Sequence, residues 1–176
     1  QIAKACRTEL QQYNGVEVYL TVEENGDTRW PGSTVSECLR NRVSYAQSMG
    51  ADLFVSIHLN AAASADAYGA EVFVSNYSKY NGTGQNLANR ILTELGKLGL
   101  YNRGVKVDVD SQQSQGNTYD DGNWVDDLSV IRNSTQSGFP SILIEHGFIT
   151  NSSDSALIRG KADEMGRADA DAIATH

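Results

Sequence analysis

The stretch Leu53-Phe54-Val55-Ser56-Ile57-His58-Leu59 decides the fold class of this 176-residue chain. Its apolar side chains fall on both faces of an extended strand, a pattern typical of a central strand that helices cover on both sides. Strand-like and helix-like segments alternate before and after it. We therefore predict one α/β domain over residues 1–176, with a twisted, mostly parallel sheet of about five to six strands flanked by helices on both faces.

The segments around this stretch follow two periodicities. Apolar residues recur at helical spacing within 2–13, 35–49, 87–98 and 156–173. The sequence Thr34-Val35-Ser36-Glu37 is a capping box that predicts the start of the second helix, and Ser153-Asp154 predicts the cap of the last. Alternation or short apolar runs predict further strands at 16–20, 70–75, 104–107, 128–131 and 141–144.

The charge balance excludes several classes of protein. Fourteen Lys and Arg against 22 Asp and Glu give a net charge of −8. This acidic balance argues against a general surface for nucleic-acid phosphates and against docking on anionic lipids. No apolar run approaches the roughly 18 residues of a membrane span. The only two cysteines, Cys6 and Cys38, are too few for a disulfide-stapled miniprotein, and whether they pair is left open.

Two strand ends carry the polar residues that could perform chemistry. In open α/β sheets, ligands bind beyond the carboxyl ends of the strands. Alternation places Ser56, His58 and Asn60 on one face of the first of these strands. Glu145 follows two isoleucines and a leucine at the end of another strand. A carboxylate there is costly unless it is paired, bound to a metal or at a cleft.

Each candidate has a structural alternative. His58 is either a hydrogen-bonded strand-end histidine or a metal or catalytic residue, and Glu145 could be a salt-bridged carboxylate. His146 follows Glu145 directly, so it faces the other way and is predicted to be a packed or surface histidine. The polar segment 108–124 is predicted to border the substrate groove, with a plain surface excursion as the alternative.

Five segments together indicate a family. The segments 51–61 (ADLFVSIHLNA) and 140–151 (PSILIEHGFITN) are the most specific, and 69–73, 103–106 and 128–132 lie between them in the same order. In this arrangement the chain resembles the zinc-dependent N-acetylmuramoyl-L-alanine amidases of the family-3 type. The resemblance covers nearly the whole chain.

The resemblance implies a secreted or extracytoplasmic, cell-wall-associated enzyme whose partner is peptidoglycan. Such an enzyme hydrolyses the amide between N-acetylmuramic acid and the L-alanine of the stem peptide. By the same resemblance, the cofactor is Zn²⁺, His58 is a zinc ligand, and Glu145 is the catalytic general base and acid. Zinc lowers the pKa of bound water, and a neighbouring carboxylate can move its proton.

The chain departs from the family pattern at its start. The family opens with a strand that ends in a histidine motif, followed by a glutamate on the first helix, and these supply two further ligands. The sequence begins at Gln1, already inside that helix. We therefore expect an upstream extension with both ligands, and weak zinc binding and no cleavage by residues 1–176 alone. A zinc exopeptidase and a non-catalytic cell-wall-binding module remain as alternatives.

Overall fold

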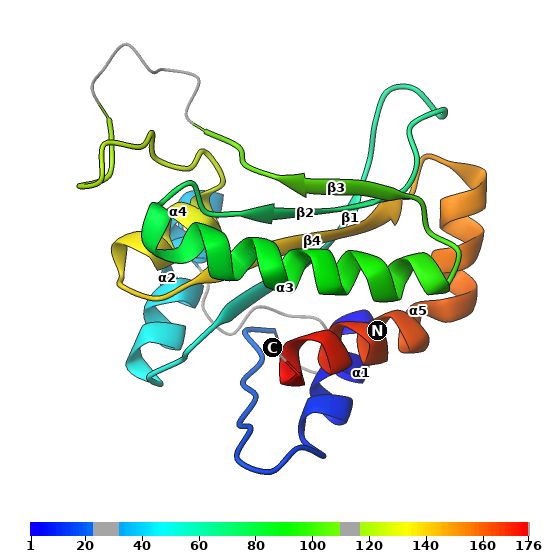
Figure 1. Cartoon of the computed structure of the whole chain (residues 1–176), viewed down its shortest axis with the longest axis horizontal. Coiled ribbons are helices and arrows are strands. Elements are labelled where there is room, and N and C mark those ends of the chain that lie inside the picture. The colour runs from blue at the N-terminus through cyan, green and yellow to red at the C-terminus, as the bar shows by residue number, and fades with distance from the viewer. Residues whose placement is uncertain (23–31, 110–116, 176) are drawn as a thin grey trace.

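The computed structural model in Figure 1 describes residues 1–22, 32–109 and 117–175. Helices and strands alternate over most of this length, as the sequence predicted. The helices are α1 (Ile2–Leu10), α2 (Val35–Ser48), α3 (Ser78–Lys97), α4 (Ser129–Gln136) and α5 (Ser152–Ala174). The strands are β1 (Phe54–Asn60), β2 (Ala70–Val74), β3 (Asn102–Lys106) and β4 (Ser141–Phe148).

The strands form one mixed sheet in the order β1-β4-β2-β3. β1 pairs with β4 and β2 pairs with β3 in parallel, whereas β2 and β4 are antiparallel. The predicted α/β class with a mostly parallel sheet is therefore confirmed, although the described residues form four strands rather than five to six. The prediction that 53–59 is a central strand is wrong for this part of the chain. β1 lies at one edge, and β4 occupies the interior.

Two further strand predictions are also wrong. Residues 128–131 are not a strand but lead into α4, whose buried positions Val130, Ile131, Ser134 and Thr135 recur at helical spacing. The run Leu-Ser-Val-Ile is too short for its period to separate the two structures. Residues 16–20 do alternate between half-buried and exposed, but they form no strand. Val16 and Val18 instead pack against α1 at Cys6 and Leu10.

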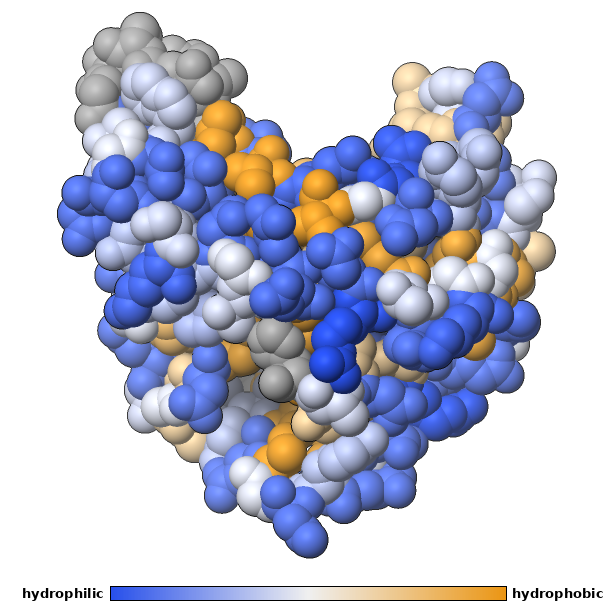
Figure 2. Space-filling view, in the orientation of Figure 1, coloured by the Kyte–Doolittle hydropathy of each residue, from blue (hydrophilic) through white to orange (hydrophobic). Residues whose placement is uncertain are grey.

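Alternation along β4 divides the core into two layers. Ile142 and Ile144 belong to the larger cluster with α3 and α5, whereas Leu143 belongs to a second cluster with α2 and α4. Helices therefore cover both faces of the sheet, as predicted. The outer surface of α3 is largely hydrophilic, as expected for an amphipathic helix whose other side is in the core (Figure 2).

The local start of α2 follows the predicted capping box. The Thr34 hydroxyl accepts a hydrogen bond from the backbone N–H of Glu37 at 3.1 Å, and the Glu37 carboxylate accepts one from the backbone of Ser33 at 2.8 Å. At α5, the cap is Asn151 rather than the predicted Ser153-Asp154.

Cys6 is buried and Cys38 is half-buried, and no disulfide joins them. Burial, together with the charge of Asp169, raises the pKa of Cys6 to about 12. No helix in the described ranges combines the length and hydrophobicity that crossing a membrane requires.

Candidate active site

The sheet register brings the two predicted site residues together. His58 of β1 and Glu145 of β4 are direct partners in the parallel pair. On the other side of β4, Glu71 of β2 is the direct partner of Glu145 in the antiparallel pair. Because directly opposite residues in a sheet project from the same face, the three side chains form a row across β1, β4 and β2. Leu143 lies on this face two residues before Glu145, where α2 and α4 cover it.

Glu145 is half-buried and incompletely hydrogen-bonded. Its Oε2 atom is buried and has no hydrogen-bond partner. Burial, and secondarily the charge of Glu71, raises the pKa of Glu145 to about 7, against a smaller opposing effect of His146. A carboxyl group with a pKa near neutrality can both accept and return a proton, which is the requirement for general acid–base catalysis.

His58 is exposed at the surface of β1 and bonds to its neighbour on the same face. Its Nε2 atom lies 2.9 Å from the Ser56 hydroxyl, so the predicted sharing of one face by these residues is confirmed. Loss of solvent around the ring lowers the pKa of His58, and the charges of Arg42 and His146 act in the same direction. The ring is therefore neutral at neutral pH, which is the form of histidine that binds metals.

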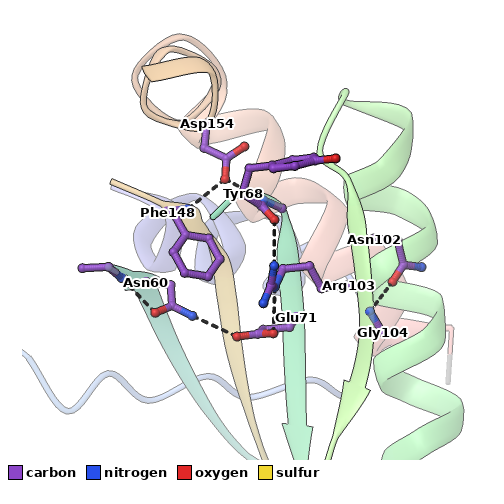
Figure 3. Close-up of polar contacts among 10 residues, drawn as sticks. Asn60, Tyr68, Glu71, Asn102, Arg103, Gly104, Phe148 and Asp154 are labelled. Carbon is purple, nitrogen blue, oxygen red and sulfur yellow. Dashed lines mark hydrogen bonds and ion pairs between the residues drawn. The ribbon is translucent and has the colours of Figure 1, made fainter. Parts of the chain in front are cut away.

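Glu71 is a buried carboxylate that two side chains hold in place, as Figure 3 shows. Its Oε1 accepts a hydrogen bond from Asn60 Nδ2 at 2.9 Å, and its Oε2 accepts one from Arg103 Nε at 2.9 Å. The Arg103 guanidinium also donates to the Tyr68 carbonyl at 3.2 Å and lies 4.9 Å from the centre of the Phe148 ring. Sequence reasoning assigned no role to Glu71, although a charge inside the apolar strand 70–74 is the same signal that singled out Glu145.

Asp154 ties the edges of this site together (Figure 3). Its Oδ2 atom accepts hydrogen bonds from the backbone N–H groups of Gly69 at 2.7 Å and Phe148 at 2.9 Å. Gly69 immediately precedes β2 and Phe148 ends β4, so one buried carboxylate at the start of α5 fixes both strand ends. Asp154 thereby holds together the ends of β2 and β4, the two strands that carry Glu71 and Glu145.

His146 points to the opposite face from Glu145 and is completely buried. Its Nε2 atom lies 2.8 Å from Asp169 Oδ2 of α5, and its Nδ1 atom lies 3.3 Å from the His58 carbonyl oxygen. Burial alone would lower the pKa of His146, but the charge and hydrogen bond of Asp169 raise it overall. His146 was predicted to be either packed or at the surface, and it is packed.

Part of the predicted groove segment 108–124 lies outside the described residues, namely 110–116. Just after this segment, Asp126 attaches the chain to the end of β2. This buried carboxylate accepts hydrogen bonds from the Ser75 hydroxyl at 2.7 Å and the Asn76 backbone at 2.8 Å. Ser75 follows the end of β2, whereas Glu71 lies near its start. The role of this segment at a substrate groove stays a prediction.

A catalytic zinc ion takes three protein ligands, usually His, Cys, Asp or Glu side chains. Within 1–22, 32–109 and 117–175, no group of three or more His, Cys, Asp or Glu residues is arranged to hold a metal. His58 is available as one ligand, and His176 lies outside the described residues. These residues therefore do not complete a zinc site.

Comparison with known protein families matches residues 1–175 to the family described as N-acetylmuramoyl-L-alanine amidase. The chain belongs to this family. The match extends over both strands that carry the site row, β1 with His58 and β4 with Glu145. The family expectation drawn from the five ordered segments is therefore confirmed.

Two relatives come from Bacillus subtilis strain 168. The chain is 31% identical to N-acetylmuramoyl-L-alanine amidase LytC over 160 residues, which is 90% of this chain and 26% of LytC. It is 37% identical to the uncharacterized protein YqiI over 134 residues, which is 75% of this chain and 53% of YqiI. The chain thus spans about half of one relative and a quarter of the other.

Two solved structures have the same fold over nearly the whole chain. Cwp6 from Clostridium difficile superposes with a TM-score of 0.74 and 28% identity, covering 98% of this chain and 24% of Cwp6. The CwlD amidase from Clostridioides difficile, solved in complex with the GerS lipoprotein, gives a TM-score of 0.73 and 26% identity, covering 98% of this chain and 80% of CwlD.

Proposed function

We propose that the protein to which residues 1–176 belong is a hydrolase that cleaves the amide bond between N-acetylmuramic acid and the L-alanine of the peptidoglycan stem peptide, and that residues 1–176 form its catalytic domain. The observation that carries the proposal is the position of Glu145, directly opposite His58 and with a buried Oε2 atom that has no hydrogen-bond partner. Membership of the amidase family supplies the substrate class. A relative from Bacillus anthracis that is described as an uncharacterized cell wall amidase also supports a secreted or extracytoplasmic location.

In this proposal Glu145 is the general base and then the general acid. Its carboxylate removes a proton from the water that attacks the amide carbon, and its carboxyl returns that proton to the leaving nitrogen. The raised pKa of about 7 suits both steps, because the group is neither fully ionised nor fully protonated near neutral pH. The oxygens of the second carboxylate, Glu71, accept hydrogen bonds from Asn60 and Arg103.

We further propose that the cofactor is Zn²⁺ and that His58 is one of its ligands, since His58 is a neutral imidazole beside Glu145. When bound, the metal would activate water and polarise the amide carbonyl. The ligand role is tested by measuring zinc in purified natural protein after dialysis, with and without His58→Ala. Loss of most of the zinc is expected, whereas unchanged zinc content would remove His58 from the ligand set. Ser48→Ala, at the exposed end of α2, is the control.

The hydrolytic role is tested by incubating the natural protein with purified peptidoglycan and with N-acetylmuramoyl-L-alanyl-D-isoglutamine. New L-alanine amino termini are expected without new reducing sugar ends. Glu145→Gln should reduce their release by at least about a hundredfold, because glutamine cannot move the proton. Glu94→Gln on α3, which changes a half-buried carboxylate paired with Lys97, should leave the rate unchanged.

Two other outcomes would replace the proposal. Release of free amino acids from peptides that lack muramic acid would identify a zinc exopeptidase. Binding to peptidoglycan without cleavage, in protein saturated with zinc, would identify a cell-wall-binding module. The incomplete set of metal ligands among the described residues makes the second alternative worth testing in the same experiment.

A further inference from the structure

Arg103 extends the row of site residues onto the fourth strand of the sheet. Its Nε atom donates a hydrogen bond to Glu71 Oε2 at 2.9 Å, so the side chains of these neighbours on β3 and β2 lie on the same face. With the strand order β1-β4-β2-β3, the row is His58, Glu145, Glu71 and Arg103. His58 and Arg103 lie at its two ends, and the carboxylates lie between them.

Three contacts fix the orientation of the Arg103 guanidinium. Besides the bond to Glu71, its Nη1 atom donates to the Tyr68 carbonyl at 3.2 Å, and the group lies 4.9 Å from the centre of the Phe148 ring. Figure 3 shows the side chain reaching from β3 across β2. Because Phe148 ends β4, the guanidinium points back toward the strand that carries Glu145. A cation held in this way gives up little further freedom when it binds a ligand.

These contacts leave one edge of the Arg103 guanidinium open. Toward the residues that the structure describes, Nε and Nη1 donate hydrogen bonds and Nη2 donates none. The side chain is 33% exposed. Partly exposed ion pairs add little to stability, so the pair with Glu71 alone does not account for a fixed cation at this position. A planar guanidinium with free N–H groups is suited to binding a carboxylate.

We propose that Arg103 binds a free carboxylate on the second residue of the stem peptide, the residue that follows the L-alanine. This inference rests on the proposed amidase function, in which the His58 end of the row takes the carbonyl and Glu145 returns a proton to the nitrogen. The departing peptide then continues away from His58, across β2 toward β3. Arg103 selects among stem peptides and takes no part in breaking the bond.

The dimensions of the sheet agree with this position. Neighbouring strands lie about 4.8 Å apart, so the backbone of β3 is about 10 Å from that of β4. The Arg103 side chain spans part of this distance, since it bonds to Glu71 on β2 and lies against Phe148 of β4. An extended peptide advances about 3.3–3.6 Å per residue, so its second residue lies about 7 Å from the scissile bond. Glu71 and Glu145 alone would repel a carboxylate there, and Arg103 is the cation of the row.

The test compares two substrates that differ only at this carboxyl group. N-acetylmuramoyl-L-alanyl-γ-D-glutamyl-L-lysine has a free α-carboxylate on the second residue, and N-acetylmuramoyl-L-alanyl-D-isoglutaminyl-L-lysine has a neutral amide in its place. Zinc-loaded natural protein should cleave the first with a kcat/KM at least about tenfold higher, because the second loses a charge-assisted hydrogen bond. The difference should lie mainly in KM, since the contact is present before and during the reaction.

The ratio of the two kcat/KM values is then measured in variants. Arg103→Gln should bring the ratio close to one while both substrates are still cleaved. Arg103→Lys keeps the charge but loses the planar fork, so it should lower the ratio part of the way. The control is Arg159→Gln, at an exposed position on α5 where the arginine bonds to Ser155 of the same helix, and it should keep the wild-type ratio. The ratio decides, because a change that only disturbs Glu71 or the fold slows both substrates alike.

The outcomes separate this inference from the proposed function. If the zinc-loaded wild type cleaves neither substrate, the proposed function fails and the role of Arg103 fails with it. If the wild type cleaves both with equal kcat/KM, or if Arg103→Gln keeps the preference for the free carboxylate, only the role of Arg103 is wrong. If Arg103→Gln does not fold or is inactive, Arg103→Lys decides, and an unchanged ratio in that variant overturns the role of Arg103.

Discussion

Glu71 and Glu145 lie directly opposite each other on the antiparallel strands β2 and β4. Two carboxylates on neighbouring strands repel each other, and opposed like charges in a sheet are destabilising. Here the repulsion is contained, because Arg103 and Asn60 both bond to Glu71. Glu71 thus accepts hydrogen bonds from both side chains, and the pKa of Glu145 is raised by burial first and by the charge of Glu71 second.

Replacing Glu71 with glutamine should lower the pKa of Glu145. Burial would still raise that pKa above the ordinary value of 4.5, but the contribution of the Glu71 charge would be lost. If Glu145 acts as the base, the acidic limb of the kcat/KM profile should move to lower pH. Carbon-13 NMR of the glutamate carboxyl groups would measure the same change without relying on activity. An unchanged titration of Glu145 would show that Glu71 does not influence it.

Glu145 should also make the fold less stable as the pH rises. Its pKa of about 7 in the folded protein exceeds the ordinary 4.5, so the folded state holds this proton more tightly than the unfolded state does. The stabilisation is present below about pH 4.5 and is lost as the pH rises through 7. The melting temperature of Glu145→Gln relative to wild type should therefore be higher at pH 8 than at pH 4.5. Equal differences at both pH values would contradict the raised pKa.

The sequence predicted the two strands that matter most, because β1 and β4 are marked by apolar runs that end in polar residues. It also predicted that His58 and Glu145 would be brought together. It could not predict their register, since the pairing of β1 with β4 depends on which strands become neighbours in the folded sheet. For the same reason the antiparallel placement of β2 beside β4, and hence the position of Glu71 opposite Glu145, was not predicted.

Two kinds of residue escaped the sequence analysis for physical reasons. Arg103 resembles any solvated arginine until β3 pairs with β2 and its guanidinium is found to bond to Glu71. Asp169 lies in an acidic, alanine-rich helix, and only the packing of α5 under β4 brings it to His146. In both cases the deciding information is a contact between segments far apart in sequence, which periodicity does not contain.

Removing Asp169 should destabilise the fold by about 3–5 kcal/mol, the usual cost of leaving one partner of a buried charged pair alone. Asp169 and His146 are both fully buried, 2.8 Å apart. Because the pKa of His146 is raised, the stabilisation should be greatest below its ordinary value of 6.5 and fall as the pH rises through the folded-state value. Urea unfolding of Asp169→Ala at pH 6 and pH 9 measures both effects. Asp163→Ala, at an exposed position on the same helix, should change the free energy of unfolding little. If Asp163→Ala destabilised the fold as much as Asp169→Ala, the buried Asp169–His146 pair would not be the cause of the loss.

Gly166 should be intolerant of any side chain, because it is where α5 packs closest to α1. A Cβ atom at this position would overlap the Ile2 carbonyl oxygen and would lie 2.8 Å from the Cys6 backbone nitrogen. Both are backbone atoms, so the overlap can be relieved only if the two helices separate. Gly166→Ala should therefore lower the free energy of unfolding by about 1–3 kcal/mol.

Gly160, also in α5, has open space where a Cβ atom would lie, with no heavy atom within 4 Å. Because the neighbouring Lys161 has non-helical φ and ψ at a kink in α5, Gly160→Ala should change the free energy of unfolding by no more than about 1 kcal/mol, the full difference in helix propensity. Urea denaturation of the two variants compares a buried and an open glycine in one helix, and equal effects would mean that α1 and α5 are not in close contact in solution.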